Sequence, residues 1–296
     1  MKLLNDKNLF RQQCYINGKW RDGEDGKTLA VNNPATDELL GTVPKAGARE
    51  TTVAIQAASN AWSTWRAKTA LERADIMQRW YALMLESRED LARILTAEQG
   101  KPLAEARGEI GFASSFIRWF AEEGRRAYGD IIPAPWPNKR IIVTREPVGV
   151  VGIITPWNFP TAMIARKAAA ALAVGCPVVI KPASQTPYSA LAMAVLAERA
   201  GVPAGVFNVV TGSAREIADE MTSNPLVRKI SFTGSTEIGK ELMQKSSKTL
   251  NRLLKKSLCG SAGSISGDVL TWIDPSFSIL EPLRESFLAV HFASRV

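Results

Sequence analysis

The sequence contains little cysteine and almost no histidine. Its 296 residues include three cysteines and a single histidine, His291. The spacings of Cys14, Cys176 and Cys259 match neither a disulfide framework nor a zinc-binding pattern, which favours a cytoplasmic protein without a metal site. Because the only histidine lies near the end of the chain, a nucleophile of the Ser-His or Cys-His type has no base in the body of the protein.

Long apolar runs are missing too. No stretch is apolar enough to span a bilayer, and the first residues lack the apolar segment that directs export. The net charge of +8 would permit a nucleic-acid partner, but most cations alternate with acids along expected helices. We therefore expect neither a membrane nor a nucleic acid as partner. A basic nucleic-acid binder stays a weaker alternative, and it would use Lys245, Lys248, Arg252, Lys255 and Lys256.

Strands and helices alternate in the second half of the chain. Nearly all-apolar strands are expected at residues 148–154, 177–182, 206–210 and 228–232, with a helix after each, at about 160–173, 187–200, 214–222 and 236–245. Buried strands that alternate with helices indicate an α/β fold with a doubly wound parallel sheet. Ligands of such sheets bind at the carboxyl ends of the strands.

The first half predicts a hairpin, a helical layer and an exposed strand. Asn17-Gly18 marks the hairpin turn, and a further strand is expected at residues 39–44. Amphipathic helices with tryptophans at core positions are expected at residues 49–67, 70–87, 89–98 and 105–128. Residues 140–146 predict a strand outside the main sheet, whose edge needs a partner. The expected units are a discontinuous α/β domain (1–133 and 147–250), a small β arm (134–146) and a tail (251–296) without sustained periodicity.

Polar residues follow the expected strands at their carboxyl ends. Asn158 comes after the first strand; its amide could stabilise an oxyanion, although a turn-forming asparagine is the plainer interpretation. Lys181 and Ser184 follow the second strand, where a cation and a hydroxyl could bind a phosphate. Gly234-Ser235 opens a helix whose first N–H groups favour an anion. It is not the G-x-G-x-x-G fingerprint, and alone it is a weak signal.

Four motifs occur together in this region. They are Thr155-Pro156-Trp157-Asn158-Phe159-Pro160, Gly175-Cys176 before Lys181-Pro182-Ala183-Ser184, Phe207-Asn208-Val209-Val210-Thr211-Gly212, and Phe232-Thr233-Gly234-Ser235-Thr236. In combination they resemble the aldehyde dehydrogenase family over about residues 1–250. Residues 8–13, 98–102 and 224–229 are most similar to its NADP-dependent succinate-semialdehyde dehydrogenases.

The resemblance implies a reaction and its site residues. It implies oxidation of succinate semialdehyde or a similar aldehyde to the acid, with NADP accepting the hydride in the domain formed by 1–133 and 147–250. It implies that Asn158 stabilises the oxyanion and that Arg166 binds the distal carboxylate of the substrate. NAD-preferring members usually carry a glutamate in place of Ser184, so NADP is favoured and NAD stays possible. The implied cofactor-binding residues are Trp157, Asn158, Lys181, Pro182, Ala183, Ser184, Gly212, Phe232, Gly234, Ser235 and Ile238.

Beyond residue 250 the sequence departs from the family pattern. The family continues with Leu-Glu-Leu-Gly-Gly, whose glutamate is the general base, whereas this chain has Leu258-Cys259-Gly260-Ser261. The resemblance places the nucleophilic cysteine further on, in a catalytic domain that the sequence does not contain. We expect a truncated chain with a poorly ordered tail that binds cofactor but is inactive alone; a frame slip or rearrangement would explain the tail. The alternative is a non-catalytic remnant that binds a dinucleotide or a partner, with a possible homo-oligomer through residues 140–146.

Overall fold

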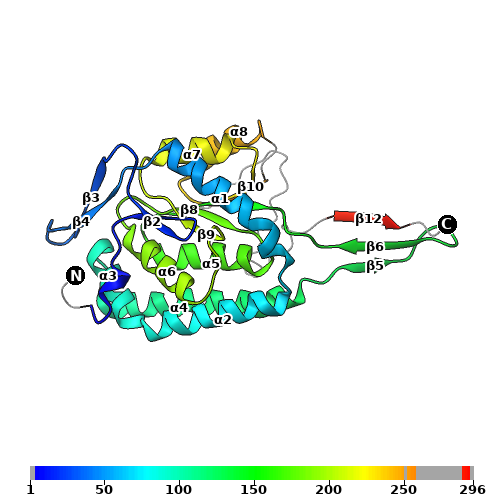
Figure 1. Ribbon diagram of the computed structural model, residues 1–296, viewed down its shortest axis with the longest axis horizontal. Helices are drawn as coiled ribbons and strands as arrows, with labels where there is room; N and C mark the ends of the chain where they lie inside the picture. Colours follow the sequence, from blue (N-terminus) through cyan, green and yellow to red (C-terminus); the bar gives the residue numbers. More distant parts are fainter. Residues whose placement is uncertain (1–3, 250–251, 258–288, 294–296) are drawn as a thin grey trace.

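The computed structural model describes residues 4–249, 252–257 and 289–293 (Figure 1). Its centre is a seven-stranded sheet with the order β11-β10-β7-β8-β9-β1-β2. Five strands are parallel to one another: β7 (Val150–Ile154), β8 (Val178–Lys181), β9 (Phe207–Val209), β10 (Val227–Gly234) and β11 (Arg252–Ser257). The antiparallel hairpin of β1 (Cys14–Ile16) and β2 (Lys19–Arg21) completes one edge. The predicted doubly wound α/β class is therefore confirmed.

Helices cover both faces of this sheet (Figure 1). One face carries α1 (Ala48–Ala67), α7 (Ala214–Ser223) and α8 (Thr236–Ser246), and the other carries α5 (Pro160–Ala173) and α6 (Tyr188–Arg199). An outer layer of α2 (Ala70–Glu86), α3 (Arg88–Gln99) and α4 (Leu103–Glu123) packs on α5 and α6. Pro160 occupies the first turn of α5, where its missing N–H has no intrahelical partner to lose.

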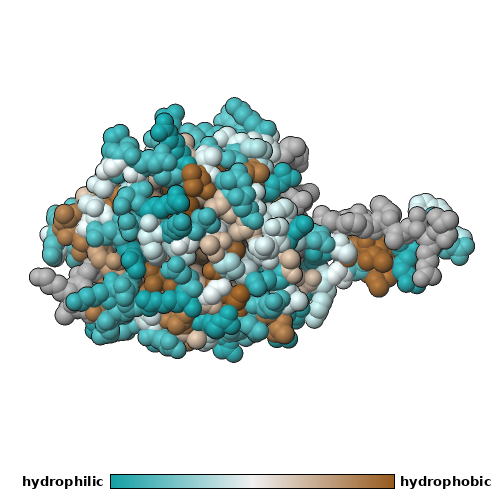
Figure 2. Space-filling model, in the orientation of Figure 1, coloured by the Kyte–Doolittle hydropathy of each residue, from teal (hydrophilic) through white to brown (hydrophobic). Residues whose placement is uncertain are grey.

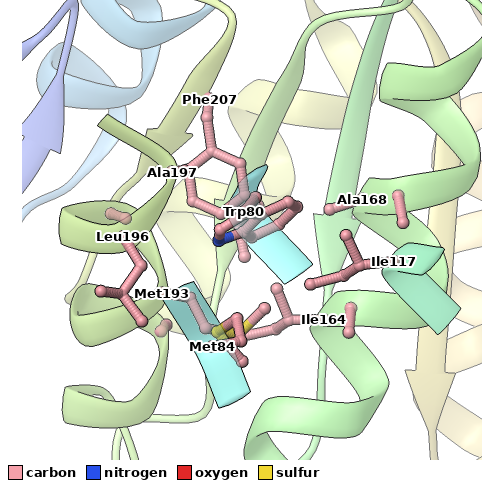
Figure 3. Packing of buried hydrophobic residues seen from close by; sticks show 14 of the residues in the cluster. Trp80, Met84, Ile117, Ile164, Ala168, Met193, Leu196, Ala197 and Phe207 are labelled. Carbon is pink, nitrogen blue, oxygen red and sulfur yellow. The ribbon is translucent and has the colours of Figure 1, made fainter. Parts of the chain in front are cut away.

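The main core lies between the sheet and this outer layer (Figure 3). Trp80 of α2 is fully buried, and its ring meets that of Phe207 edge-on with centroids 5.5 Å apart. Met84, Ile117 and Ile164 fill the adjoining space between α2, α4 and α5. The prediction that tryptophans at helical spacing belong to the core is therefore confirmed for Trp80.

Smaller elements complete the body. A two-stranded sheet pairs β3 (Thr28–Asn32) with β4 (Leu39–Pro44), and short 3-10 turns form η1 (Lys7–Leu9) and η2 (Gly124–Arg126). The pattern predicts a helix to residue 128, whereas α4 ends at Glu123 and the tighter η2 follows. β3 is not predicted, because only Val31 of its side chains is buried.

A β arm projects from the body (Figure 1). It contains β5 (Asp130–Ile132) and β6 (Arg140–Thr144), so it begins four residues before the boundary expected at 134. Figure 2 shows an apolar patch on the arm, where Ile131, Ile132 and Ile142 are exposed. The strand expected at 140–146 does lie outside the main sheet.

Two strands lie in the segment for which the sequence predicts no regular structure. β11 pairs parallel with β10, and β12 (Ala289–Ala293) pairs antiparallel with β6. Both join the free edge of a strand, where backbone hydrogen bonds form without any side-chain alternation. The main sheet thus continues past the boundary expected at residue 250. Residues 251, 258–288 and 294–296 of the expected tail lie outside the described residues.

Candidate functional site

The loops that follow β7, β8, β9 and β10 emerge at one edge of the sheet. Ile154 of β7 pairs with Lys181 of β8 on one side and with Phe232 of β10 on the other. The chain runs from β7 outward to β8 and β9 and then returns to β10, so the strand order reverses between β7 and β10. Such a reversal is where doubly wound sheets bind ligands. The predicted strand-end residues are therefore neighbours at this reversal.

Lys181 and Ser184 form a polar pair at the carboxyl end of β8. The Lys181 Nζ donates to Ser184 Oγ at 3.4 Å, and Ser184 Oγ donates to the carbonyl oxygen of Gly212 at 3.4 Å. Lys181 is 4% exposed, and burial lowers the pKa of its ammonium to about 8. No carboxylate forms a salt bridge with Lys181 in the described part of the chain. A buried cation beside a hydroxyl can bind a phosphate.

The backbone conformation at position 212 and the close approach of Ala46 explain why this residue is a glycine. Its φ is +135°, and an added Cβ would lie 2.1 Å from the carbonyl oxygen of Ala46. Ala46 bridges to Gly212, and its carbonyl accepts a bond from the N–H of Ser213 at 2.9 Å. This close approach holds the loop after β9 beside Ser184.

The loop after β10 leads directly into α8. Ser235 caps this helix, since its Oγ accepts from the N–H of Ile238 at 3.4 Å. Gly234 packs on Phe232, where an added Cβ would lie 2.4 Å from the aromatic ring. The Ser235 oxygen accepts from the helix and its O–H proton can still be donated, so this hydroxyl and the first N–H groups of α8 can meet an anion here. Ile238 is 45% exposed on the same turn.

Asn158 lies in the loop between β7 and α5. Its backbone carbonyl oxygen accepts from Lys101 Nζ at 3.1 Å. Its side-chain Oδ1 is buried and has no hydrogen-bond partner within residues 4–249. The flanking Trp157 and Phe159 are 52% and 42% exposed. The loop therefore presents two aromatic side chains around an amide.

Lys101 and Glu109 contact this loop and the start of α5, and neither residue is predicted from the sequence as part of the site. Lys101 Nζ lies 2.6 Å from Glu109 Oε2, and the other carboxylate oxygen accepts from the N–H groups of Thr161 and Ala162. The sequence does contain a sign of this contact, because Glu109 lies at helical spacing from Ala106 and Ala113 on the buried face of α4. A carboxylate on an apolar face indicates a buried partner.

Arg166 lies half-buried on α5. Its guanidinium stacks on the ring of Phe116 of α4, 5.6 Å from the centroid. Burial lowers its pKa, and no carboxylate pairs with it where the structure is described. Without the resemblance, Arg166 would be taken for a solvated helix residue; its partial burial makes it suited to bind an external carboxylate.

The cysteines within residues 4–249 do not form a catalytic site. Cys14 and Cys176 are buried, and burial raises the pKa of both thiols, which disfavours the nucleophilic thiolate. Cys259 lies outside the described residues. The described residues contain no cluster of three or more candidate metal ligands and no helix able to cross a membrane.

Lys245, one of the basic residues considered for nucleic-acid binding, forms salt bridges with two carboxylates of the same chain. Lys245 Nζ lies 2.6 Å from Asp219 Oδ1 and 2.5 Å from Glu241 Oε1. Arg118 likewise pairs with Glu122 along α4, at 3.1 Å. These pairs fit solvated helix faces better than a phosphate-binding surface.

Comparison with known proteins identifies the family. The sequence pattern of the aldehyde dehydrogenase family matches residues 20–261. A succinate-semialdehyde dehydrogenase [NADP(+)] of Escherichia coli is 62% identical over 250 residues, and a glutarate-semialdehyde dehydrogenase of Pseudomonas aeruginosa is 61% identical over 250; each alignment covers 84% of this chain and 52% of the relative.

Solved structures agree with these matches. An NADP-dependent enzyme of Escherichia coli superposes with a TM-score of 0.85 at 61% identity, covering 86% of this chain and 53% of that one. An NAD-dependent aldehyde dehydrogenase from Sinorhizobium meliloti gives 0.81 at 36% identity, covering 86% and 52%. The chain thus spans about half the length of the relatives it matches. It belongs to the aldehyde dehydrogenase family.

Proposed function

We propose that this chain provides the NADP-binding half of a dehydrogenase that oxidises a short semialdehyde to the carboxylic acid. The observation that carries the proposal is the buried Lys181 beside Ser184, with no carboxylate paired to the cation in the described part of the chain. A serine in this place leaves room for the 2′-phosphate of NADP, which a glutamate would repel, and its hydroxyl can donate to that phosphate by turning away from the Gly212 carbonyl. NADP, when bound, accepts the hydride; NAD would bind more weakly.

The residues around the strand reversal have distinct roles in this proposal. Lys181 and Ser184 bind the ribose phosphate, and the first N–H groups of α8 meet the pyrophosphate. Trp157, Phe232 and Ile238 supply apolar contacts, while Pro182, Ala183 and Gly212 shape the wall. The Asn158 amide donates to the aldehyde oxygen as negative charge develops on it.

Arg166 selects the substrate in this proposal. Relatives named for succinate and glutarate semialdehyde act on aldehydes with a carboxylate at the far end of a short chain. A half-buried guanidinium that lacks a carboxylate partner among the described residues would bind that carboxylate. The Phe116 ring beneath it limits where the guanidinium can lie.

The proposal includes inactivity of the chain alone. An oxyanion donor lowers the barrier of a reaction only when a nucleophile is present. Cys14 and Cys176 are buried with raised pKa values, and the sequence has no segment like that of the family's nucleophile. The chain would therefore bind NADP without turning over an aldehyde.

A homo-oligomer through the arm is a further part of the proposal. Ile131 and Ile132 expose apolar surface on β5, and Ile142 does so on β6. Both edges of β6 are already paired, with β5 and with β12. A second chain would therefore contact the face of the arm or its outer edges, instead of an edge of β6.

Two measurements on the purified full chain test this function. Calorimetric titration is expected to show NADP binding more tightly than NAD, and absorbance is expected to show no NADPH formation with succinate semialdehyde. Failure to bind either dinucleotide would contradict the cofactor assignment. Turnover that Cys259→Ala abolishes would contradict the inactivity.

A further inference from the structure

The start of α5 has no cap of its own. Phe159 stands at the N-cap and makes no side-chain hydrogen bond to the helix. The cap comes instead from α4, where Glu109 Oε1 accepts from the N–H of Thr161 at 3.0 Å and of Ala162 at 3.1 Å. A carboxylate in this position satisfies free N–H groups and lies at the positive end of the helix dipole. Glu109 thus fixes the residues that follow the Asn158 loop.

Lys101 connects the same carboxylate to Asn158 itself. Its Nζ lies 2.6 Å from Glu109 Oε2 and 3.1 Å from the carbonyl oxygen of Asn158. The ammonium also lies over the ring of Phe159, 4.2 Å from the centroid. The side chains of Lys101 and Glu109 are 9% and 1% exposed. A buried ion pair persists only when its charged atoms have partners, and here both carboxylate oxygens and the ammonium have them.

We propose that Lys101 and Glu109 are positioning residues, a Lys101–Glu109 clamp that aims the side-chain amide of Asn158. The buried Oδ1 of Asn158 has no hydrogen-bond partner within residues 4–249, so no bond to that atom orients the amide. Its direction depends on the backbone of residues 158–162, which the clamp holds at the Asn158 carbonyl and at the N–H groups of Thr161 and Ala162. The clamp rests on the proposed function only in that Asn158 serves as the oxyanion donor and cofactor neighbour.

The fold contains a matched control for the helix-capping part of this clamp. Glu98 of α3 is also buried and caps α6, accepting from the N–H groups of Tyr188 at 2.6 Å and Ser189 at 2.8 Å. The N-cap residue of α6, Pro187, likewise makes no side-chain bond. Glu98 has no lysine partner among the described contacts, and it caps a different helix. Glu98→Gln therefore disturbs a buried helix cap without touching residues 158–162.

Hydrogen exchange of the full chain, read by mass spectrometry, tests the clamp without requiring activity. Amides of residues 157–162 are expected to exchange about tenfold faster or more in Glu109→Gln and in Lys101→Met, the scale of one lost charge-assisted hydrogen bond. Lys101→Arg, which keeps the cation, is expected to restore most of the protection. Glu98→Gln is expected to raise exchange at the start of α6 and to leave residues 157–162 unchanged.

The NADP dissociation constant is the second readout. It is expected to rise several-fold in Lys101→Met and little in Glu98→Gln. Wild-type exchange at 157–162 in Lys101→Met and Glu109→Gln, or an equal increase there in Glu98→Gln, would overturn the clamp. If the unmodified chain binds no NADP, the proposed function fails, while the exchange data still decide whether the clamp exists. If Glu109→Gln does not fold, Lys101→Met still tests the clamp, because this variant retains Glu109 as the cap of α5.

Discussion

The ammonium of Lys181 lies 3.4 Å from the hydroxyl of Ser184, and neither group is paired with a carboxylate in the described part of the chain. The hydroxyl in turn donates to the Gly212 carbonyl of the next loop. The loops after β8 and β9 thus meet beside one buried cation. In the proposed function, the charge of that cation and the side chain at position 184 together determine which dinucleotide binds.

Ser184→Glu is expected to reverse the cofactor preference. A carboxylate about 4 Å from the 2′-phosphate would repel it by about 4 kcal/mol per charge pair at an effective dielectric of ~20. Calorimetric titration should show NADP affinity falling by at least tenfold while NAD affinity holds or improves. Gln185→Glu, which adds the same charge at the next, exposed position, should preserve the preference. Equal affinities of the unmodified chain for NAD and NADP would contradict the role of Ser184.

The affinity for NADP should decrease above about pH 8. Burial lowers the pKa of Lys181 to about 8, so the ammonium is charged below that pH and becomes neutral above it. A bound phosphate stabilises the charged form, so the midpoint in the complex lies at or above 8. Titrations across pH 7 to 9.5 should show the loss in the unmodified chain and a flatter profile in Lys181→Met. Identical profiles for the two proteins would rule out this role for the cation.

Glu98 should make the fold less stable as pH rises from about 4.5 to about 8. Burial raises the pKa of its carboxyl from 4.5 to about 8, so in this window the folded state holds a proton that the unfolded state has lost. The free energy of unfolding then falls with pH, by up to about 1.4 kcal/mol per unit. Glu98→Gln removes the titrating group and should flatten that slope in urea denaturation. An unchanged slope would mean that the N–H groups of Tyr188 and Ser189 keep the folded carboxylate ionised.

Trp80→Ala should be strongly destabilising. Its fully buried ring packs between α2 and the sheet, and truncation of such an aromatic residue typically costs about 3–5 kcal/mol. Trp157→Ala is the matched control, because that side chain is 52% exposed and its loss should cost about 1 kcal/mol or less. Chemical denaturation of both variants gives the comparison. Equal losses would contradict the packing in Figure 3.

The sequence predicts those parts of the fold that depend on local patterns. The β-branched runs of β7 and β8, Pro160 at the start of α5 and Asn17-Gly18 in the first hairpin all follow from residue type and spacing. The place of Asn158, Lys181 and Ser184 at the sheet edge follows too, since a strand's carboxyl end can be read from the chain direction.

Other features depend on contacts between distant parts of the chain. Glu109 meets α5 across 52 residues, and no local pattern pairs those positions. β11 and β12 are formed through backbone pairing at strand edges, so their side chains need no periodic signal. Phe116 beneath Arg166 requires knowing that α4 packs on α5. These contacts are tertiary, and the local pattern around one residue does not show which distant residue it will meet.

The remote capping of α5 and α6 has a consequence for how the chain folds. Each helix receives its cap from a glutamate side chain 52 to 91 residues earlier, on α4 and α3 respectively. Neither helix can reach its full stability before the outer layer has docked on it. Long loops must therefore close before these bonds contribute, which slows folding but makes it more cooperative. Helices α5 and α6 and the outer layer of α2, α3 and α4 therefore gain and lose their structure together.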